Sequence, residues 1–245
     1  TGIDAKTIPF DDPRTLSLFS STEGIGLTPE QLQGDQVASL AVPACGTKFV
    51  RGMLEDSRPQ TFSDLVRISG FSHGTNVWLD NAQELIKNGT CKLNEAISTR
   101  DDVMNFLIHR GMDRKHSFFV MENVRKGKGI EKRNKQGQAT TEFEAEMREN
   151  NIPEWFIESC KKISYLFPRA HAVAYVMMAF RIAWFKVYHP LAFYAAYFSI
   201  RAKAFDLRIM TGDLKTQMTE FNRIKALDRA ASPKDKDLMS ALEVS

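Results

Sequence analysis

Apolar side chains recur three and four positions apart along most of the chain from residue 61 onward. This spacing places them on one face of an α-helix, which a folded domain buries. Phe62, Leu65 and Val66 form the first such face. Others fall within 81–88, 99–110, 116–125, 142–150, 153–166, 168–189 and 190–202, and residues 206–245 are amphipathic and charged. The pattern predicts a mainly α protein with few or no strands.

Capping residues mark the ends of several predicted helices. Thr61 is expected to begin a helix whose third residue, Asp64, compensates its exposed amides, and Gly70 is expected to end it. Thr99 is expected to begin another helix, which Gly111 closes.

The first sixty residues lack long periodic segments. Proline and glycine interrupt them repeatedly, and such residues favour turns, so we expect short helices and irregular connections. Within this region the apolar run 37–42 predicts a short strand, and 47–56 has helical spacing.

A basic stretch separates two groups of predicted helices. Residues 125–141 hold six Lys and Arg side chains and one acid, Glu131, which predicts an exposed loop inserted in the helical region. Flexible basic side chains can neutralise phosphates without reading bases, so Arg125, Lys126 and Lys128 are candidates for nucleic-acid contact. On these residues alone, a solvated run of charge is the simpler interpretation.

Bulk composition narrows the class of protein only slightly. The net charge of +3 neither requires nor excludes a nucleic-acid partner. Cys45, Cys91 and Cys160 are far apart and form no CxxC pair, so neither a disulfide framework nor a zinc site is expected. A reducing, cytoplasmic location fits this cysteine usage best.

The apolar run 172–188 is expected to be a buried helix and not a membrane span, because Arg181 and Lys186 interrupt it. We therefore expect no membrane partner. The chain begins at Thr1 and ends at Ser245 within an amphipathic pattern, which predicts a segment of a longer protein.

The run from Phe167 to His171 is the most informative local motif. Pro168 favours the start of a helix, whose first amides and dipole are positive. Arg169 and His171 add positive groups at the same end, an arrangement suited to a bound anion such as a phosphate. Phe167 would then stack on a base. A solvated arginine beside an ordinary surface or core histidine is the simpler alternative, favoured on these residues alone.

Three further positions carry weaker signals. Ser69 or Ser72 beside His73 suggests a nucleophilic pair, but no third group is evident and a helix-capping turn is favoured. Arg100 begins a helix, where an ion pair and a phosphate contact are equally plausible. Arg110 near the end of that helix is explained by complementing the dipole.

No complete active site is visible. Two-metal phosphoryl transfer needs carboxylates held close together, whereas the adjacent pairs Asp11–Asp12 and Asp101–Asp102 lie in loop or helix-start contexts. No catalytic residue and no metal ligand is therefore predicted within this chain.

Several long runs, in order, resemble the fingers of PolC-type DNA polymerase III alpha subunits, which are bacterial replicative polymerases of the C family. The similarity covers nearly the whole chain and is densest between residues 47 and 201. The runs are Thr47–Arg51, Glu55–Val66, Ile68–Thr75, Asn81–Ile86, Val124–Gly129 and Phe167–Ala172.

This resemblance implies an irregular multi-helix fingers region of a template-directed DNA polymerase. The catalytic aspartates and Mg²⁺ would belong to a palm preceding this chain, so the segment alone is expected to be inactive. Its partners would be template–primer DNA, dNTP, the other polymerase domains and, through them, the replisome. The implied nucleotide-binding residues are Ser69, Arg100, Arg110, Phe167, Arg169 and His171. The implied DNA-binding residues are Arg125, Lys126 and Lys128.

The resemblance also suggests a domain organisation. Residues 1–60 would form a loop-rich segment between palm and fingers, 61–205 the helical fingers core, and 206–245 a helical segment leading toward the next domain. Arg169 stands where the family pattern has lysine, which keeps the charge. The stretch 130–140 is longer than usual, so no role is assigned to its basic residues.

Two interpretations from other classes stay open. A non-catalytic helical nucleic-acid-binding module would use the basic loop as its working surface. A helical scaffold would bind neither nucleotide nor DNA.

Overall fold

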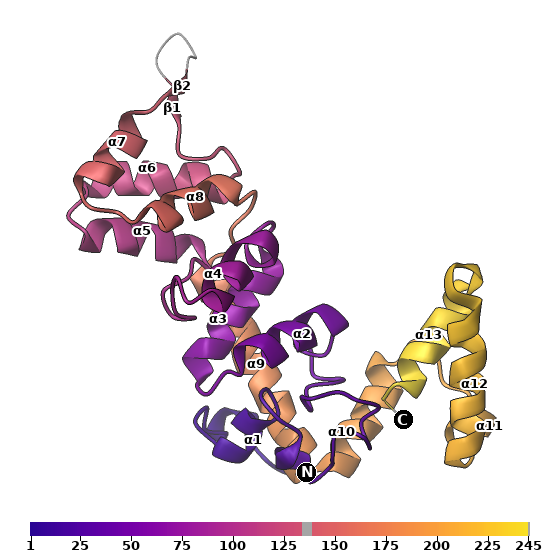
Figure 1. Cartoon of the computed structure of the whole chain (residues 1–245). Coiled ribbons are helices and arrows are strands. Elements are labelled where there is room, and N and C mark those ends of the chain that lie inside the picture. Colours follow the sequence, from indigo (N-terminus) through magenta and orange to yellow (C-terminus); the bar gives the residue numbers. More distant parts are fainter. Residues whose placement is uncertain (134–138, 245) are drawn as a thin grey trace.

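The computed structural model describes residues 1–133 and 139–244 and is mainly α-helical, as predicted (Figure 1). Within these residues the paired strands are limited to β1 (Lys132–Arg133) and β2 (Ala139–Thr140), which are antiparallel. The helices are α1 (Pro13–Ser17), α2 (Lys48–Ser57), α3 (Phe62–His73), α4 (Gln83–Lys87), α5 (Arg100–His109), α6 (Arg114–Arg125), α7 (Glu142–Glu149), α8 (Glu154–Lys162), α9 (Arg169–Tyr188), α10 (Pro190–Ala196), α11 (Leu207–Met210), α12 (Leu214–Leu227) and α13 (Pro233–Leu242).

Helix α9 is the central support of the molecule. It lies along α3 and reaches down to the N-terminal segment (Figure 1). Phe180 in its middle is fully buried, and the rings of Phe10, Phe62 and Phe19 surround it at centroid distances of 5.8, 6.0 and 6.3 Å. The loop-rich N-terminal residues and the helical region therefore share one hydrophobic core.

Helices α5 to α8 form one end of the molecule, and α11 to α13 stand apart at the other (Figure 1). The C-terminal helices have a small core of their own, built from Met210, Ala241 and Leu242 with Phe198, Ile209, Phe221 and Leu238 against it. The division into 1–60, 61–205 and 206–245 stays a prediction.

Two local predictions are wrong. Residues 37–42 form no strand. Val37, Ala38 and Val42 are buried in a run of bends and turns, where the Ala38 amide donates to Leu18 O and the Val42 amide to Ser39 O. Helix α3 does not end at Gly70 but continues to His73. The glycine lies inside the helix, where its missing side chain admits the chain before α5.

Helix α6 ends at Arg125, as the spacing predicted, and the basic stretch follows it. A tight turn comes first, in which Lys126 and Lys128 are exposed while Ile130 is buried. The pairing of β1 with β2 was not predicted. Lys135 lies outside the described residues.

A buried lysine joins α9 to the N-terminal region. Lys186 is 5% exposed, and its ammonium donates to Ala38 O at 2.8 Å and Leu40 O at 2.7 Å.

Within the described part of the chain, α9 is the one helix long and apolar enough to cross a bilayer. Its buried face, with this internal lysine, is that of a core helix.

We expect Lys186→Met to lower the free energy of unfolding by only about 1–2 kcal/mol at neutral pH, since losing two hydrogen bonds is offset by removing a buried charge. Burial lowers the pKa of Lys186 from 10.5 to about 8. Between these two values the unfolded chain binds the extra proton, so stability rises with pH. The wild type should therefore gain stability over Lys186→Met from pH 8 to 10.5, measured by urea unfolding. If the difference in unfolding free energy between wild type and Lys186→Met stays the same from pH 8 to 10.5, the lowered pKa of Lys186 is contradicted.

Candidate functional site

The segment 163–168, which joins α8 to α9, brings three helix ends together. It passes the end of α3, the start of α5 and the end of α6, and hydrogen-bonds to each neighbourhood. The bonds run from Thr75 N to Tyr165 O (3.0 Å), from Arg100 N to Phe167 O (3.2 Å) and from Leu166 N to Arg125 O (3.3 Å). Residues far apart in the sequence are thereby placed at the beginning of α9.

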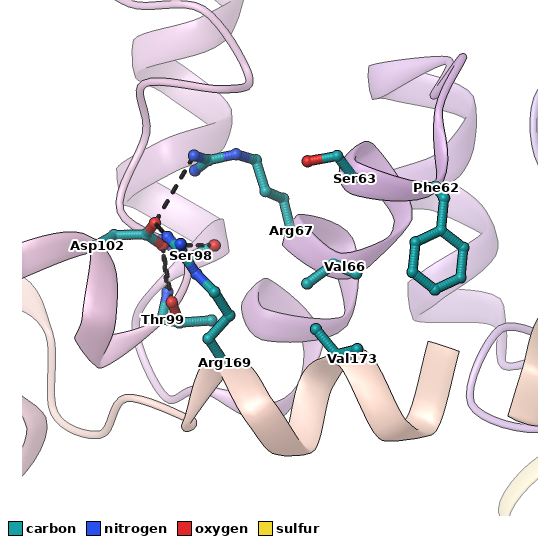
Figure 2. A pocket seen from close by; sticks show the side chains of 9 residues that line it. All are labelled: Phe62, Ser63, Val66, Arg67, Ser98, Thr99, Asp102, Arg169 and Val173. Carbon is teal, nitrogen blue, oxygen red and sulfur yellow. Dashed lines mark hydrogen bonds and ion pairs between the residues drawn. The ribbon is translucent and has the colours of Figure 1, made fainter. Parts of the chain in front are cut away.

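Arg169 begins α9 and is held by two carboxylates of α5. Its backbone amide donates to Asp101 at 2.8 Å, and its guanidinium forms an ion pair with Asp102 (Figure 2). Arg67 of α3 reaches the same carboxylate at 3.7 Å. The Asp102 side chain is 9% exposed and that of Arg169 is 42% exposed. Arg169 is thus fixed in position while part of its guanidinium faces solvent.

Asp102 is the centre of this ion-pair cluster. One of its oxygens accepts hydrogen bonds from the backbone amides and hydroxyls of Ser98 and Thr99, at 2.7–3.0 Å. Burial would raise the pKa of Asp102, but Arg67, the Ser98 hydroxyl and Arg169 outweigh it and hold the pKa below its ordinary value. The carboxylate is therefore ionised at any physiological pH.

A pocket of about 260 Å³ opens beside the cluster. Figure 2 shows Arg67, Asp102 and Arg169 on its polar side, with Phe62 and Val173 on its apolar side.

Four rings gather on the other side of α9. The Phe167 ring stacks on His73 with centroids 4.7 Å apart, and His171 meets it edge-on at 5.7 Å. Tyr175 stacks on His73 at 5.3 Å and is 42% exposed. One face of Phe167 is therefore already covered by His73, and Tyr175 and His171 are the more exposed rings.

Ser69 lies one helical turn below this ring cluster. It is 7% exposed; its carbonyl lies 2.7 Å from Nδ1 of His73, and its hydroxyl is buried without a hydrogen-bond partner. A carbonyl only accepts, so the hydrogen bond to Ser69 O requires the proton on Nδ1, which then cannot act as a base toward Ser72, 3.0 Å away. In that arrangement Ser72 and His73 both bond to Ser69 O within the last turn of α3 and do not form a nucleophilic pair.

Arg100 and Arg110 lie at opposite ends of α5, about 15 Å apart at the ordinary helical rise. Arg100 is half-buried beside the cluster, and its side chain makes no ion pair with the described residues. Arg110 donates to Asn151 O at 3.1 Å and lies 5.3 Å from the Phe106 ring. The structure places Arg100 with Arg169 but Arg110 away from them.

The three basic residues assigned to DNA lie at the end of α6 and in the turn after it. Arg125 and Lys126 both form ion pairs with Glu122, the latter at 2.9 Å. The hydrogen bonds from Arg125 and then Lys126 lower the pKa of Glu122 to about 2. Lys128 is exposed and makes no ion pair within the described residues.

The turn is fixed against the 163–168 segment by Gly127. Its φ of +68° favours glycine, and a Cβ there would lie 2.5 Å from Ser164 O. The basic turn and the start of α9 are consequently parts of one surface.

Among residues 1–133 and 139–244 no cluster of three His, Cys, Asp or Glu side chains could hold a metal ion. Asp12 instead caps α1 and accepts from the Tyr188 hydroxyl at 2.9 Å.

Sequence reasoning missed Arg67, Tyr175 and the role of Asp102. Tyr175 lies four residues after His171, so its shared helix face could have been read from the spacing. The convergence of Arg67 on Asp102 has no local signal in the sequence.

Comparison with known proteins gives one consistent family. Residues 1–151 match the family described as the bacterial DNA polymerase III alpha subunit finger domain. The chain is 54% identical over 245 residues to the PolC-type DNA polymerase III of Thermotoga maritima, 53% over 245 to that of Caldanaerobacter subterraneus subsp. tengcongensis and 52% over 248 to that of Bacillus subtilis. All of this chain is covered in each case, but only 17, 17 and 16% of the relative. The chain therefore belongs to the bacterial DNA polymerase III alpha subunit finger domain family and corresponds to the fingers region of PolC-type enzymes.

Proposed function

We propose that this chain holds the incoming dNTP and the template–primer DNA in a replicative DNA-directed DNA polymerase. The observation that carries the proposal is the meeting of the starts of α5 and α9: the Arg100 amide donates to Phe167 O, Asp101 and Asp102 hold Arg169, and His171 lies on the ring-bearing side of α9. The N-termini of α5 and α9 carry partial positive charge, and Arg100 and Arg169 add cationic side chains at these helix ends. Such a group of cations and helix N-termini suits the triphosphate of a nucleotide.

Charge balance supports a bound anion. Asp102 pairs with both Arg67 and Arg169, Asp101 accepts from the Arg169 amide, and the half-buried Arg100 at the start of α5 makes no ion pair with the described residues. The two carboxylates therefore leave an excess of positive charge near the start of α9. A phosphate group can still approach Arg169, because part of its guanidinium is exposed.

The ring cluster supports a base-contacting role. Tyr175 is 42% exposed whereas Phe167 is half-buried, so we assign the direct contact with the nascent base pair to Tyr175, with Phe167 behind it. Ser69 would act from beneath, through its bond to His73. Arg125, Lys126 and Lys128 would contact DNA phosphates.

The chemistry is assigned to a region outside this chain. The described residues do not fit a two-magnesium centre, because no three of their His, Cys, Asp or Glu side chains cluster; Asp12 caps α1 and Asp102 is bound in the ion-pair cluster. Mg²⁺ and the catalytic aspartates would come from a palm, and the segment alone would be inactive. The other polymerase domains and the replisome would be its protein partners, in the cytoplasm.

We expect Arg169→Ala and His171→Ala, each introduced into a full-length PolC-type polymerase, to lower kcat/KM for dNTP by about 10- to 100-fold, mainly through KM. Arg169→Lys should recover most of the loss because it keeps the charge. Arg223→Ala is the matched control, since Arg223 is a half-exposed, ion-paired arginine of α12. Unchanged KM and kcat in both site variants would overturn the proposed triphosphate seat.

A nucleic-acid-binding module without a catalytic role is the competing function, and the exposed basic turn favours it. Such a module would lose DNA affinity on neutralisation of Arg125, Lys126 and Lys128, with a reduced salt dependence. It would be insensitive to Arg169→Ala. Steady-state kinetics and a salt titration of DNA binding together separate the two functions.

A further inference from the structure

Two large rings are exposed side by side on α6, outside the site described above. Phe118 and Phe119 are 46% and 44% exposed, and their centroids lie 6.1 Å apart in an edge-to-face arrangement. The buried face of the same helix is made of Val120, Met121 and Val124. The two phenylalanines are thus not part of the core that α6 forms with its neighbours.

Basic side chains precede the rings on the same face of the helix. Arg114 lies four residues before Phe118, and Lys115 lies four residues before Phe119, so each pair is adjacent on the surface. Arg114 and Lys115 are exposed, and neither forms an ion pair with any residue in 1–133 or 139–244. Their charges are available to an external anion.

Positive charge also follows the rings. One turn beyond them, Glu122 is paired with both Arg125 and Lys126, which leaves one positive charge in excess. Along its outer side α6 therefore presents a basic pair, an aromatic pair and then a net positive group. The distance from Arg114 to Arg125 is about 17 Å at the helical rise, enough for a few nucleotides.

The outer side of α6 is here called the α6 strip and consists of Arg114, Lys115, Phe118, Phe119 and Lys126. We propose that the α6 strip binds unpaired template ahead of the polymerase site. Bases of a single strand have free faces that stack on exposed rings, while basic groups follow the backbone. A duplex offers no free base faces to the rings. The inference rests on the proposed function, since it assumes that the chain works on template–primer DNA.

The position of the α6 strip agrees with this role. Its Arg125 end meets the 163–168 segment, where Arg125 O accepts from Leu166 N at 3.3 Å. That segment leads directly into the proposed nucleotide seat at Arg169. A template strand leaving the seat along α6 would meet Lys126 first, the rings next and Arg114 last. The flanking charges favour a polyanion over an apolar protein partner.

The test compares two template–primer duplexes bound by a full-length PolC-type polymerase carrying this segment. They differ only in the unpaired template, which is one nucleotide in the first and about eight in the second, within the range of known single-strand sites. The long overhang is expected to bind about tenfold more tightly, measured by fluorescence anisotropy. The double variant Phe118→Ala/Phe119→Ala should lose this gain and bind the short overhang as before.

Matched variants separate stacking from other effects. Phe49→Ala removes a ring of equal exposure (47%) from α2 and should leave the gain intact. Phe118→Trp/Phe119→Trp should retain it, whereas the double leucine variant should lose it. Arg114→Gln/Lys115→Gln should reduce the salt slope for the long overhang by about 1.4, the value for two single-strand phosphate contacts.

The outcomes are distinguishable. If the double alanine variant keeps the overhang gain, or loses affinity equally for both duplexes, the α6 strip does not bind single-stranded template. Retention of the gain by the leucine variant would likewise exclude stacking. Failure of the unmodified polymerase to bind either duplex would overturn the proposed function as well.

Discussion

Asp102→Asn is expected to lower the free energy of unfolding of this chain by about 2–4 kcal/mol. Removing one partner of a buried ion pair generally costs 3–5 kcal/mol, and the part-exposed guanidinium of Arg169 reduces the effect. The asparagine amide would also direct its NH₂ donors at guanidinium or backbone N–H groups, which can only donate. Urea unfolding followed by circular dichroism measures the change.

The pH dependence gives this prediction a specific signature. Because the pKa of Asp102 is held below its ordinary value, its stabilisation is complete above pH 3.8 and is lost as pH falls through the lower, folded-state pKa. The difference between wild type and Asp102→Asn should therefore shrink under acid. A difference that stays constant as pH falls would contradict the ion-pair role.

Asp64→Asn is the matched control for Asp102→Asn. Asp64 and Asp102 hold the same position in capping boxes, with Thr61 and Thr99 as their partners. Asp64 lacks the two arginines, so its replacement should cost only about 0.5 kcal/mol. In polymerase kinetics Asp102→Asn should also raise KM for dNTP, because Arg169 loses its anchor, while Asp64→Asn should not.

Local signals predicted much of the fold because local bonds make it. Thr61 and Thr99 begin their helices as the capping pattern predicted, and Gly111 follows α5 with a φ of +94°. Each of these features depends on atoms within a few residues. The mainly helical class followed from apolar spacing for the same reason.

The sequence-based predictions were wrong or incomplete where contacts between distant parts of the chain determine the structure. The apolar run 37–42 reads as a strand, but it pairs with no strand among the described residues and forms turns within the core instead. The sequence singled out the motif around Phe167 and His171 and the motif around Ser69. It did not predict that the first would pack against the end of α3, which carries Ser69. The sequence pattern gave no sign that Asp102 holds Arg169, which lies 67 residues later.

Gly70 is the clearest example of a residue that is required by a tertiary contact and not by local structure. The sequence presents it as a helix stop, whereas it lies inside α3 at a helical position. A Cβ there would lie 2.6 Å from Ser98 O and 2.9 Å from Cγ2 of Thr99. The glycine is therefore required by the contact between α3 and the start of α5.

Gly70→Ala should lower the free energy of unfolding by about 2–3 kcal/mol, since a backbone oxygen cannot yield without moving the α5 cap, and the gain in helix propensity recovers only about 1 kcal/mol. Gly52→Ala is the matched control within α2. A Cβ at Gly52 meets nothing within 4 Å, so that variant should be stabilised by about 0.5–1 kcal/mol. Urea unfolding of the two variants should thus give opposite signs.

The two glycine variants also test how the nucleotide seat is built. A Cβ at Gly70 would push Thr99, which caps α5 together with Asp102, and Asp102 in turn holds Arg169. Gly70 itself is not proposed to contact the nucleotide. Gly70→Ala should consequently raise KM for dNTP in the full-length polymerase, and Gly52→Ala should not. If Gly70→Ala destabilises the chain yet leaves KM unchanged, the α3–α5 contact serves the fold alone, and Arg169 is held for nucleotide binding by something other than the α5 cap.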